Sequence, residues 1–367
     1  MKDRFRYAHA SGADWQECVA RCAAALGKPA GSLGFIYFTD GLLPHAAEMV
    51  DTLRELTGVS DWVGTVGVGI VATGKEYVGE PALALMVADL PSDSYRIFSG
   101  KRRAPHPGER TPAGAIAAHF AVVHGDPQTP DMAELVSDMA TRVESGYLVG
   151  GLSSGQSETA QVANEVLTGG LSGVVLASDV PVATRHTQGC TPLPARHTVT
   201  QCEDNILITL DGRPALDVFE EDVGASLAGD LRRAAQLMHV GFPVQGSDTG
   251  DYVVRNLVGI DPKNKLIAVG DMVEPGNTIL FCKRDPQTAR EDLARVLADL
   301  KQQVPSPRGA LYFSCVSRGE HLFGRRGAEL EQIRDAIGDV PLVGFFCNGE
   351  ISHDRLYGYT GVLTLFH

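Results

Sequence analysis

The sequence lacks any stretch that approaches the roughly 18 consecutive apolar residues of a membrane-spanning helix, and its first ten residues carry charges rather than an apolar core. It also lacks a CxxC pair, and its seven cysteines are an odd number. These absences argue against a membrane protein, a secretory leader and a disulfide framework. We therefore expect a cytoplasmic protein with reduced thiols, in which Cys18 and Cys22 lie on the inward face of a helix.

Positive charge is scarce as well. The chain has 32 Lys and Arg against 45 Asp and Glu, a formal net charge of -13 at pH 7. Nucleic-acid binding depends on cationic contacts to phosphates, so we expect no nucleic-acid partner. The one compact basic cluster, residues 101–103, lies beside Pro105 and Pro107 and is interpreted as a solvated loop.

The common catalytic motifs are missing. No GxSxG elbow, Walker loop, GxGxxG after a strand or HExxH occurs, and the glycine spacing of GVGIVATG (residues 67–74) fits no phosphate loop. We therefore expect a binding protein rather than an enzyme. An enzyme of unassigned chemistry, with Glu350 as a general base, is the least favoured alternative.

One arrangement of segments occurs more than once. The first copy is GFIYFTDG (34–41), a helix at 46–56, WVGTVGVG (62–69) and ALALMVADL (82–90). The second is GALYFSCVSRG (309–319), a helix at 328–337, LVGFFCNGE (342–350) and GVLTLF (361–366). A partial third is HFAVVHGD (119–126), a helix at 132–143, LVGGLSSGQ (148–156) and SGVVLASDV (172–180). Upstream, residues 5–26 correspond to residues 279–300, so the chain is predicted to be internally duplicated.

The repeated unit determines the expected fold class. Each copy has a strand, a helix and two further strands, so there are too few helices to cover both faces of a sheet. We therefore expect an α/β protein with mixed sheets, stacked face to face in α-β-β-α layers, and with short returns after the Val-Gly turns. Residues 181–194 are rich in turn formers, which favours two domains, residues 1–189 and 190–367.

Several segments resemble a known family. FSCVSRG (313–319), PLVGFFCNGEISHDR (341–355) and YVVRNLVGID (252–261) are similar to a FIST C-terminal domain, whereas Val63-Gly64, LVGGLSSG (148–155) and QGCTPL (188–193) resemble a FIST N-terminal domain. The resemblance implies an intracellular signal-transduction sensor for small ligands such as amino acids. It leaves no room for an output module in this chain, so we expect a stand-alone sensor whose partner is a separate protein, such as a kinase or a cyclase.

Polar residues in Gly-containing turns are the candidate ligand site. They are Cys315, Arg318 and Gly319 after one strand, Asn348, Gly349 and Glu350 in the CNGE turn, Ser153, Ser154 and Gln156 in the matching SSGQ turn, and Arg255 as an outer contributor. An α-amino acid offers a carboxylate for Arg318 and an ammonium group for Glu350, and Asn348 can serve either. A turn arginine contributes little to a core, so we expect Arg318→Ala to fold.

Histidines and cysteines provide two weaker candidates. The only dense Cys/His cluster, at His186, Cys190, His197 and Cys202, has irregular spacing, so no metal site is expected. No cofactor is expected either. The alternative is a haem-based nitric-oxide sensor, because some proteins related to the FIST family resemble such sensors; its candidate ligands are His119, His124, His186, His197 and His239, which the sequence does not rank.

Overall fold

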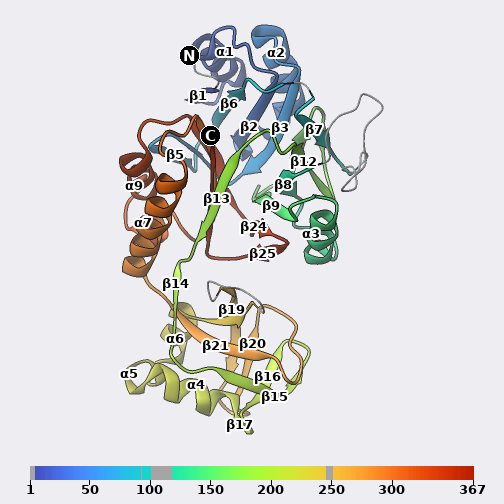
Figure 1. Ribbon diagram of the computed structural model, residues 1–367. Coiled ribbons are helices and arrows are strands. Elements are labelled where there is room, and N and C mark those ends of the chain that lie inside the picture. Colours follow the sequence, from blue (N-terminus) through green and yellow to red (C-terminus); the bar gives the residue numbers. More distant parts are fainter. Residues whose placement is uncertain (1–4, 92, 101–117, 245–250) are drawn as a thin grey trace. The chain divides into compact units, whose positions relative to one another are not determined.

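A computed structural model describes residues 5–91, 93–100, 118–244 and 251–367 (Figure 1). The basic cluster at residues 101–103 lies outside the described residues. The chain forms two compact units, one of Met1–Thr187 with Arg290–His367 and one of Gln188–Ala289. The chain thus leaves the first unit close to the predicted boundary at residue 189, but the expected second domain is divided between the two units.

Three six-stranded sheets make up the first unit, and each is named here after the repeat whose strands form its centre. The N-terminal sheet has the order β1 (Phe5–Ser11), β6 (Ala82–Ala88), β2 (Leu33–Thr39), β3 (Asp61–Gly67), β10 (Gln161–Ala163) and β11 (Val166–Leu167). The middle sheet has the order β7 (Tyr95–Phe98), β12 (Leu171–Leu176), β8 (Phe120–Gly125), β9 (Tyr147–Leu152), β24 (Glu350–His353) and β25 (Arg355–Tyr357). The C-terminal sheet has the order β13 (Val182–Thr187), β26 (Gly361–Phe366), β22 (Gly309–Cys315), β23 (Leu342–Cys347), β4 (Gly69–Ala72) and β5 (Lys75–Val78).

The three sheets share one strand order, which confirms the predicted duplication and the mixed sheets. In each repeat the first strand pairs in parallel with the strand after the helix and antiparallel with the closing strand. One upstream strand completes the edge: β1 beside β6, β7 beside β12 and β13 beside β26. The predicted match of residues 279–300 to residues 5–26 is wrong in this respect, because β21 (Thr278–Arg284) lies in the second unit and β13 takes the edge position instead.

The Val-Gly dipeptides are not turns, as the sequence suggested, but lie inside the strands β3, β9 and β23. A Cβ atom on Gly64, Gly150 or Gly344 would lie 1.6, 1.8 or 1.7 Å from a carbonyl oxygen of the neighbouring parallel strand. Only glycine permits this approach of two backbones. The recurring glycine therefore allows two parallel strands to pack closely at an equivalent place in each repeat.

Between the strand after its helix and its closing strand, each repeat sends a hairpin into another sheet. Hairpin β4–β5 of the N-terminal repeat pairs with β23, hairpin β24–β25 of the C-terminal repeat pairs with β9, and hairpin β10–β11 of the middle repeat pairs with β3. The exchange is cyclic, so each sheet is completed by a neighbour. The first unit consequently has a pseudo-threefold arrangement.

The inner faces of the three sheets share one apolar core. At its centre lie Tyr37, His124 and Phe313, which occupy equivalent positions next to the close-packed glycines and contact one another, with ring centroids 5.6 to 6.3 Å apart. The Tyr37 hydroxyl is 3.2 Å from Nε2 of His124. This shared core is the face-to-face packing that the sequence predicted.

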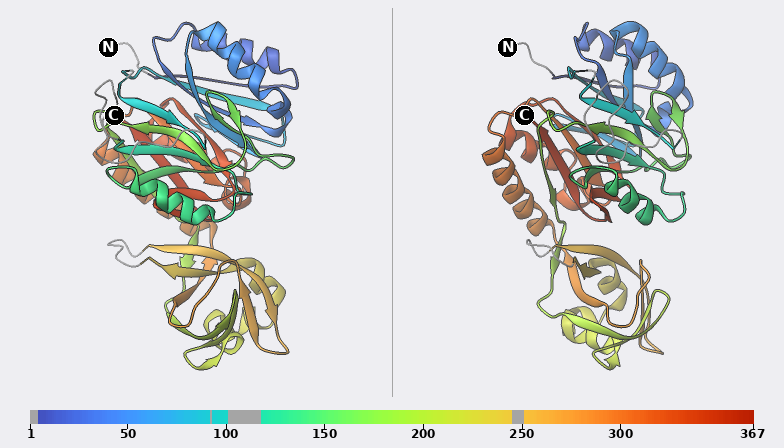
Figure 2. Two further views of the ribbon diagram at one scale, coloured as in Figure 1. Left: turned by 90° about the vertical axis from the view of Figure 1, so that its right-hand side faces the viewer. Right: turned by 45° about the vertical axis from the view of Figure 1, so that its right-hand side comes forward.

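Helices cover the outer faces (Figure 2). They are α1 (Trp15–Leu26), η1 (Asp40–His45) and α2 (Ala46–Thr57) at the N-terminal sheet, α3 (Met132–Thr141) at the middle sheet, and α7 (Pro286–Gln303), α8 (Glu320–Phe323) and α9 (Ala328–Ile337) at the C-terminal sheet. Cys18 and Cys22 lie on the buried face of α1, as predicted. The α-β-β-α layering is confirmed, with three sheets around the core instead of two.

The second unit is a closed barrel with helices of its own. Its strands are β14 (Cys190–Pro192), β15 (His197–Glu203), β16 (Ile206–Leu210), β17 (Arg213–Pro214), β18 (Met238–Pro243), β19 (Tyr252–Asp261), β20 (Leu266–Val269) and β21. The sheet closes because β18 pairs with both β19 and β21. Its helices are α4 (Ala215–Val223), α5 (Ala225–Ala228) and α6 (Leu231–Leu237), and Phe219 of α4 packs on Phe281 in the barrel core.

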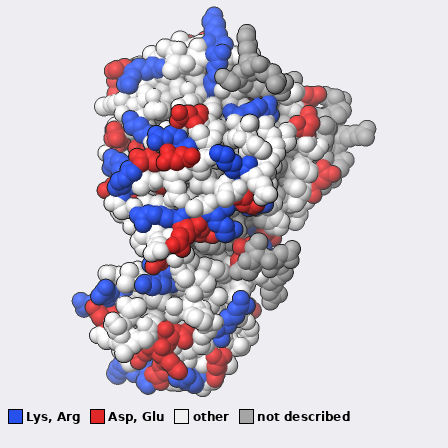
Figure 3. Space-filling view, turned by 60° about the vertical axis from the view of Figure 1, so that its left-hand side comes forward, with Lys and Arg blue, Asp and Glu red and all other residues white. Residues whose placement is uncertain are grey.

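Charged side chains of both signs are interspersed on the face shown in Figure 3. Helix α7 takes part in two ion pairs, Arg295 with Asp292 at 2.7 Å and Arg185 with Asp299 at 2.6 Å. Within the described ranges, none of the helices is long and apolar enough to cross a membrane.

Candidate functional site

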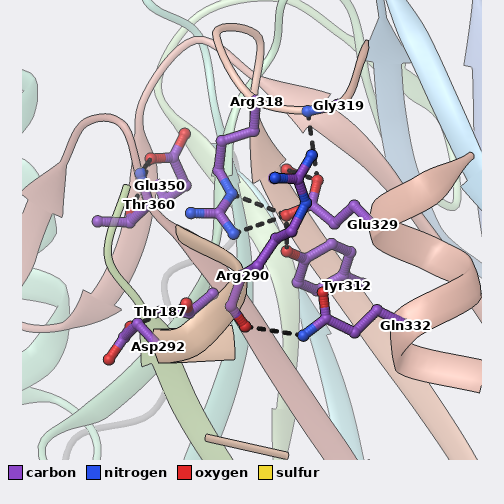
Figure 4. Close-up of polar contacts among 11 residues, drawn as sticks. Thr187, Arg290, Asp292, Tyr312, Arg318, Gly319, Glu329, Gln332, Glu350 and Thr360 are labelled. Atoms are coloured by element: carbon purple, nitrogen blue, oxygen red, sulfur yellow. Dashed lines mark hydrogen bonds and ion pairs between the residues drawn. The ribbon is translucent and has the colours of Figure 1, made fainter. Parts of the chain in front are cut away.

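Arg318 follows β22 but does not project into solvent, as a turn arginine would. Only 1% of the residue is exposed, and its guanidinium group is ion-paired with Glu329 in the first turn of α9. Nε and Nη2 of Arg318 lie 2.8 and 2.7 Å from Oε1 of Glu329 (Figure 4). The expectation that Arg318 contributes little to the folded core is therefore wrong.

Glu329 also collects further hydrogen bonds from the C-terminal repeat. Tyr312 donates its hydroxyl to Oε1 at 2.6 Å, while Ser314 Oγ and the backbone N–H of Gly319 donate to Oε2 at 3.1 and 3.3 Å. Burial is the largest single influence on the pKa of the Arg318 guanidinium and lowers it, but the charge of Glu329, the hydrogen bond to Glu329 and the neighbouring Tyr312 and Cys315 together raise it above its ordinary value. The pair is thus a fully buried, hydrogen-bonded charge pair, a type in which removal of one partner is costly.

Glu350 lies on the other side of the Arg318 guanidinium in Figure 4. Its Oε2 accepts hydrogen bonds from the backbone N–H and the hydroxyl of Thr360, at 3.1 and 2.8 Å. Burial nevertheless raises the pKa of Glu350 to about 8. A carboxyl group with this pKa is mostly protonated at neutral pH, so it is a poor counter-ion for the ligand ammonium group that the sequence led us to expect there.

Cys315 is the last residue of β22 and is buried. Burial, and then the neighbouring Glu350, raise its pKa to about 12. At neutral pH the side chain is therefore a thiol rather than a nucleophilic thiolate.

A pocket of about 190 Å³ opens beside Arg318. Its lining residues are Val68, Glu76, Val78, Val316, Arg318, Gly319, Glu320, His321 and Phe346. In the N-terminal repeat they come from the exchanged hairpin β4–β5 and the residue before it. In the C-terminal repeat they come from the residues after β22, the start of α8 and the end of β23. The cyclic exchange thus brings residues from opposite ends of the chain into one pocket.

Gly319 leaves space at the centre of this lining. Its φ of +53° lies in the region that favours glycine, and a Cβ atom there would be 3.0 Å from the Phe346 ring and 3.5 Å from Oε2 of Glu76. Of the predicted site residues, Arg318 and Gly319 line the pocket.

The SSGQ and CNGE turns meet, but mostly through their backbones. The N–H of Asn348 donates to the carbonyl of Leu152 at 3.0 Å, and the N–H of Leu152 donates to the carbonyl of Gly349 at 2.9 Å. Asn348 is exposed and does not line the pocket. Ser154 links two residues of the pocket lining, because its hydroxyl donates to the carbonyl of Phe346 and accepts the N–H of Val68 at 2.9 Å.

The remaining predicted residues have other places. Ser153 is buried with its hydroxyl 2.6 Å from that of Thr65, and the backbone N–H of Gln156 donates to Asp40 at 2.7 Å. Arg255 lies on β19 of the second unit, where it is ion-paired with Asp271 at 2.9 Å. The structure does not bring these residues to the Arg318 pocket.

Sequence reasoning missed the two carboxylates that matter most, Glu329 and Glu76. A signal existed for Glu329, which precedes Ile333 and Ile337 by four and eight residues and so lies on the buried stripe of its helix. No comparable signal marks Glu76, whose neighbours Lys75 and Val78 are exposed or half-buried on a hairpin. Its place in the site depends on the exchange of that hairpin.

The histidines and cysteines considered as haem or metal ligands do not line this pocket. His119 pairs with Glu144 at 3.5 Å, His124 lies in the core, His186 stacks on Tyr357, His197 lies between Asp211 and Asp222 at 2.7 and 2.9 Å, and His239 is buried on β18. Burial lowers the pKa of His124 to about 3. Cys202 donates to the carbonyl of Val273, and the part of the chain that the structure describes contains no group of three or more His, Cys, Asp or Glu placed to hold a metal ion.

Comparison with known proteins agrees with the resemblance seen in the motifs. The FIST N domain model matches residues 32–213 and the FIST C domain model matches residues 215–353. An uncharacterized protein of Mycobacterium tuberculosis is 30% identical over 350 residues, which cover 89% of each chain. An uncharacterized protein of Mycobacterium bovis is 28% identical over 371 residues, which cover 95% of this chain and 94% of the relative. The chain belongs to the FIST family, whose domains are sensory domains of signal transduction.

Proposed function

We propose that this protein binds a small amino-acid-like ligand in the pocket beside Arg318 and passes the signal to a separate partner protein. The observation that carries the proposal is the Arg318 guanidinium group, which is buried at the pocket and whose Nη1 has no hydrogen-bond partner among the described residues. An unsatisfied buried polar group typically costs about 1 to 3 kcal/mol. A ligand carboxylate that accepts from Nη1 would recover that free energy.

The charge state and the size of the pocket support this class of ligand. Glu329 engages Nε and Nη2 of Arg318, so a second carboxylate can approach the remaining edge of the planar fork. The volume of about 190 Å³ is smaller than the ~300 to 1,000 Å³ that drug-sized ligands occupy. A small α-amino acid is the kind of ligand that meets both conditions.

The origin of the pocket walls suggests how binding is signalled. A ligand that touches both the β4–β5 hairpin and the end of β22 favours conformations in which the two are held together. A partner protein, of the kinase or cyclase type, would respond to that shift in conformation.

The test is isothermal titration calorimetry with glycine, L-alanine and L-serine on the parent and on Val78→Phe, which places a larger side chain in the pocket. Val258→Phe is the matched control, because Val258 is 64% exposed in the second unit. We expect Val78→Phe to weaken binding at least tenfold and the control to bind like the parent. Absence of binding to the parent, or equal affinity of parent and Val78→Phe, would refute the proposal.

A further inference from the structure

Glu76 is a buried carboxylate without a complete set of partners. It lies on β5, 4% exposed, and lines the pocket. The backbone N–H of Gly327 donates to the carboxylate, but Oε2 has no hydrogen-bond partner within the described residues. A buried carboxylate oxygen at a pocket is expected to have a partner, and a ligand can provide one.

The charges around the pocket do not balance. They are the carboxylates of Glu76, Glu320 and Glu329 and the guanidinium groups of Arg318 and Arg326. Three carboxylates minus two guanidinium groups leave one negative charge in excess. Arg318 is neutralised by Glu329 at 2.7 Å, and Arg326 is 3.8 Å from Glu320 and 3.9 Å from Glu80. Among the described residues, Glu76 is therefore the one of these three carboxylates without an ion-pair partner.

Gly319 keeps the approach to Glu76 open. A Cβ atom on Gly319 would lie 3.5 Å from the unpartnered Oε2 of Glu76, so this oxygen borders the space that a side chain at position 319 would fill. Burial raises the pKa of Glu76, and the nearby Glu329 and Glu320 raise it further, while Arg326 lowers it. A cation bound in this space would hold the carboxylate in its charged form.

We infer that Glu76 binds the ammonium group of the ligand and that the pocket selects small amines and monocarboxylic amino acids over dicarboxylic ones. The inference rests on the proposed function, since it concerns the same pocket. A second ligand carboxylate would approach Glu76 and Glu320, and like charges close together in a site of low polarity repel strongly. Glu76 is thus assigned as the specificity-determining residue, and Arg318 as the group for the ligand carboxylate.

The test uses four probes, which are glycine, ethylamine, propionate and L-aspartate, titrated into the parent, Glu76→Gln and the control Glu80→Gln. Glu80 follows the same hairpin but is exposed. We expect the parent to bind glycine at least tenfold more tightly than L-aspartate. Glu76→Gln should lose at least tenfold in affinity for glycine and ethylamine, keep its affinity for propionate and discriminate less against L-aspartate, while Glu80→Gln behaves like the parent.

The outcomes separate the two proposals. If the parent and Glu76→Gln bind glycine and ethylamine equally, the role of Glu76 is refuted while the Arg318 pocket stands. If the parent binds none of the four probes, both proposals fail. Should Glu76→Gln not fold, Glu76→Asp retains the charge but withdraws it by one methylene, and unchanged affinity for both amines in that variant would likewise overturn the inference.

Discussion

Replacement of Glu329 by glutamine should destabilise the first unit severely. The substitution keeps the size of the side chain and an acceptor for Tyr312, but it leaves Arg318 as a charged group that is 1% exposed and has no counter-ion. Breaking a buried ion pair by removal of one partner typically costs about 3 to 5 kcal/mol. Since folded domains are stable by only about 5 to 15 kcal/mol, the variant should unfold at a much lower denaturant concentration.

The same helix offers a matched control. Glu331 lies two residues further along α9 and is ion-paired with Arg325, but the side chains of Arg325 and Glu331 are 62% and 35% exposed. Exposed pairs of this kind contribute about 0 to 1 kcal/mol. Glu331→Gln should therefore change the free energy of unfolding by less than about 1 kcal/mol, although it removes the same chemical interaction.

A double variant distinguishes the unpaired charge from a general loss of packing. In Arg318→Met with Glu329→Gln the buried cation is gone, so no uncompensated charge remains in the core. We expect the double variant to be more stable than Glu329→Gln alone by about 2 kcal/mol or more. A double variant that is less stable than the single one would show that the charge is not the cause.

Urea unfolding followed by tryptophan fluorescence is the appropriate assay. Both tryptophans, Trp15 and Trp62, belong to the first unit, so the signal reports on the unit that contains the ion pair. The reasoning is refuted if Glu329→Gln shifts the free energy of unfolding no more than Glu331→Gln does.

Four further predictions concern packing and burial. Gly344→Ala should lower the free energy of unfolding by about 3 kcal/mol, because the new Cβ atom would lie 1.7 Å from the carbonyl oxygen of Tyr312. Gly229→Ala is the control, since its Cβ atom would have room. Equal denaturation midpoints for the two variants would contradict the close packing of the strands. The pKa of His124 is lowered from an ordinary 6.5 to about 3 in the folded state, so its contribution to stability is present above pH 6.5 and is lost as the pH falls toward 3, by up to about 1.4 kcal/mol per pH unit. In His124→Phe the free energy of unfolding should therefore depend less steeply on pH in this range. If urea unfolding at several pH values gives the same dependence for the parent and the variant, His124 is not its cause. The pKa of Glu350 is raised from 4.5 to about 8, so its contribution to stability is present below pH 4.5 and is lost as the pH rises through 8. As the pH rises from 5 to 9, Glu350→Gln should therefore become more stable relative to the parent. If the free energies of unfolding of the two proteins change in parallel with pH, Glu350 is not a buried neutral carboxyl group. In native thiol labelling Cys202, the one cysteine of the seven that is not buried, should react first, and rapid labelling of Cys18 and Cys22 would contradict their burial on α1.

The repeated strand order was predictable because every copy carries the same local pattern of apolar strand, helix and Val-Gly strand. The strands β2 and β22 are buried throughout and read as continuous apolar runs, which is typical of strands that are covered on both faces. The edge strand β13 was missed because VATRHT (182–187) is short and partly polar, whereas residues 279–300 matched the first repeat better. Local similarity thus identified the copies but not the strand at their edge.

The ligand site was predicted less well for a physical reason. Arg318 was found from its position after a strand, but its burial depends on Glu329, which belongs to a separate helix. Glu350 was proposed as a charged ligand group, yet burial raises its pKa, and burial is a property of the folded molecule. Glu76 reaches the pocket only because hairpin β4–β5 pairs with β23, and strand propensity does not specify a pairing partner about 270 residues away.

The cyclic exchange of hairpins has a consequence for how the chain reaches its folded state. Residues 69–78 cannot pair with β23 until residues 342–347 have been synthesised. Likewise, β3 and β9 remain unpaired at one edge until β10 and β24 have been synthesised. Contacts between such distant segments slow folding, and strands that wait for their partners expose edges that can pair with other chains. The division between the two family domains at residues 213–215 is therefore not a folding boundary. Cutting the chain there would separate β4–β5 from β23, and each fragment should require the other, added in trans, to become structured.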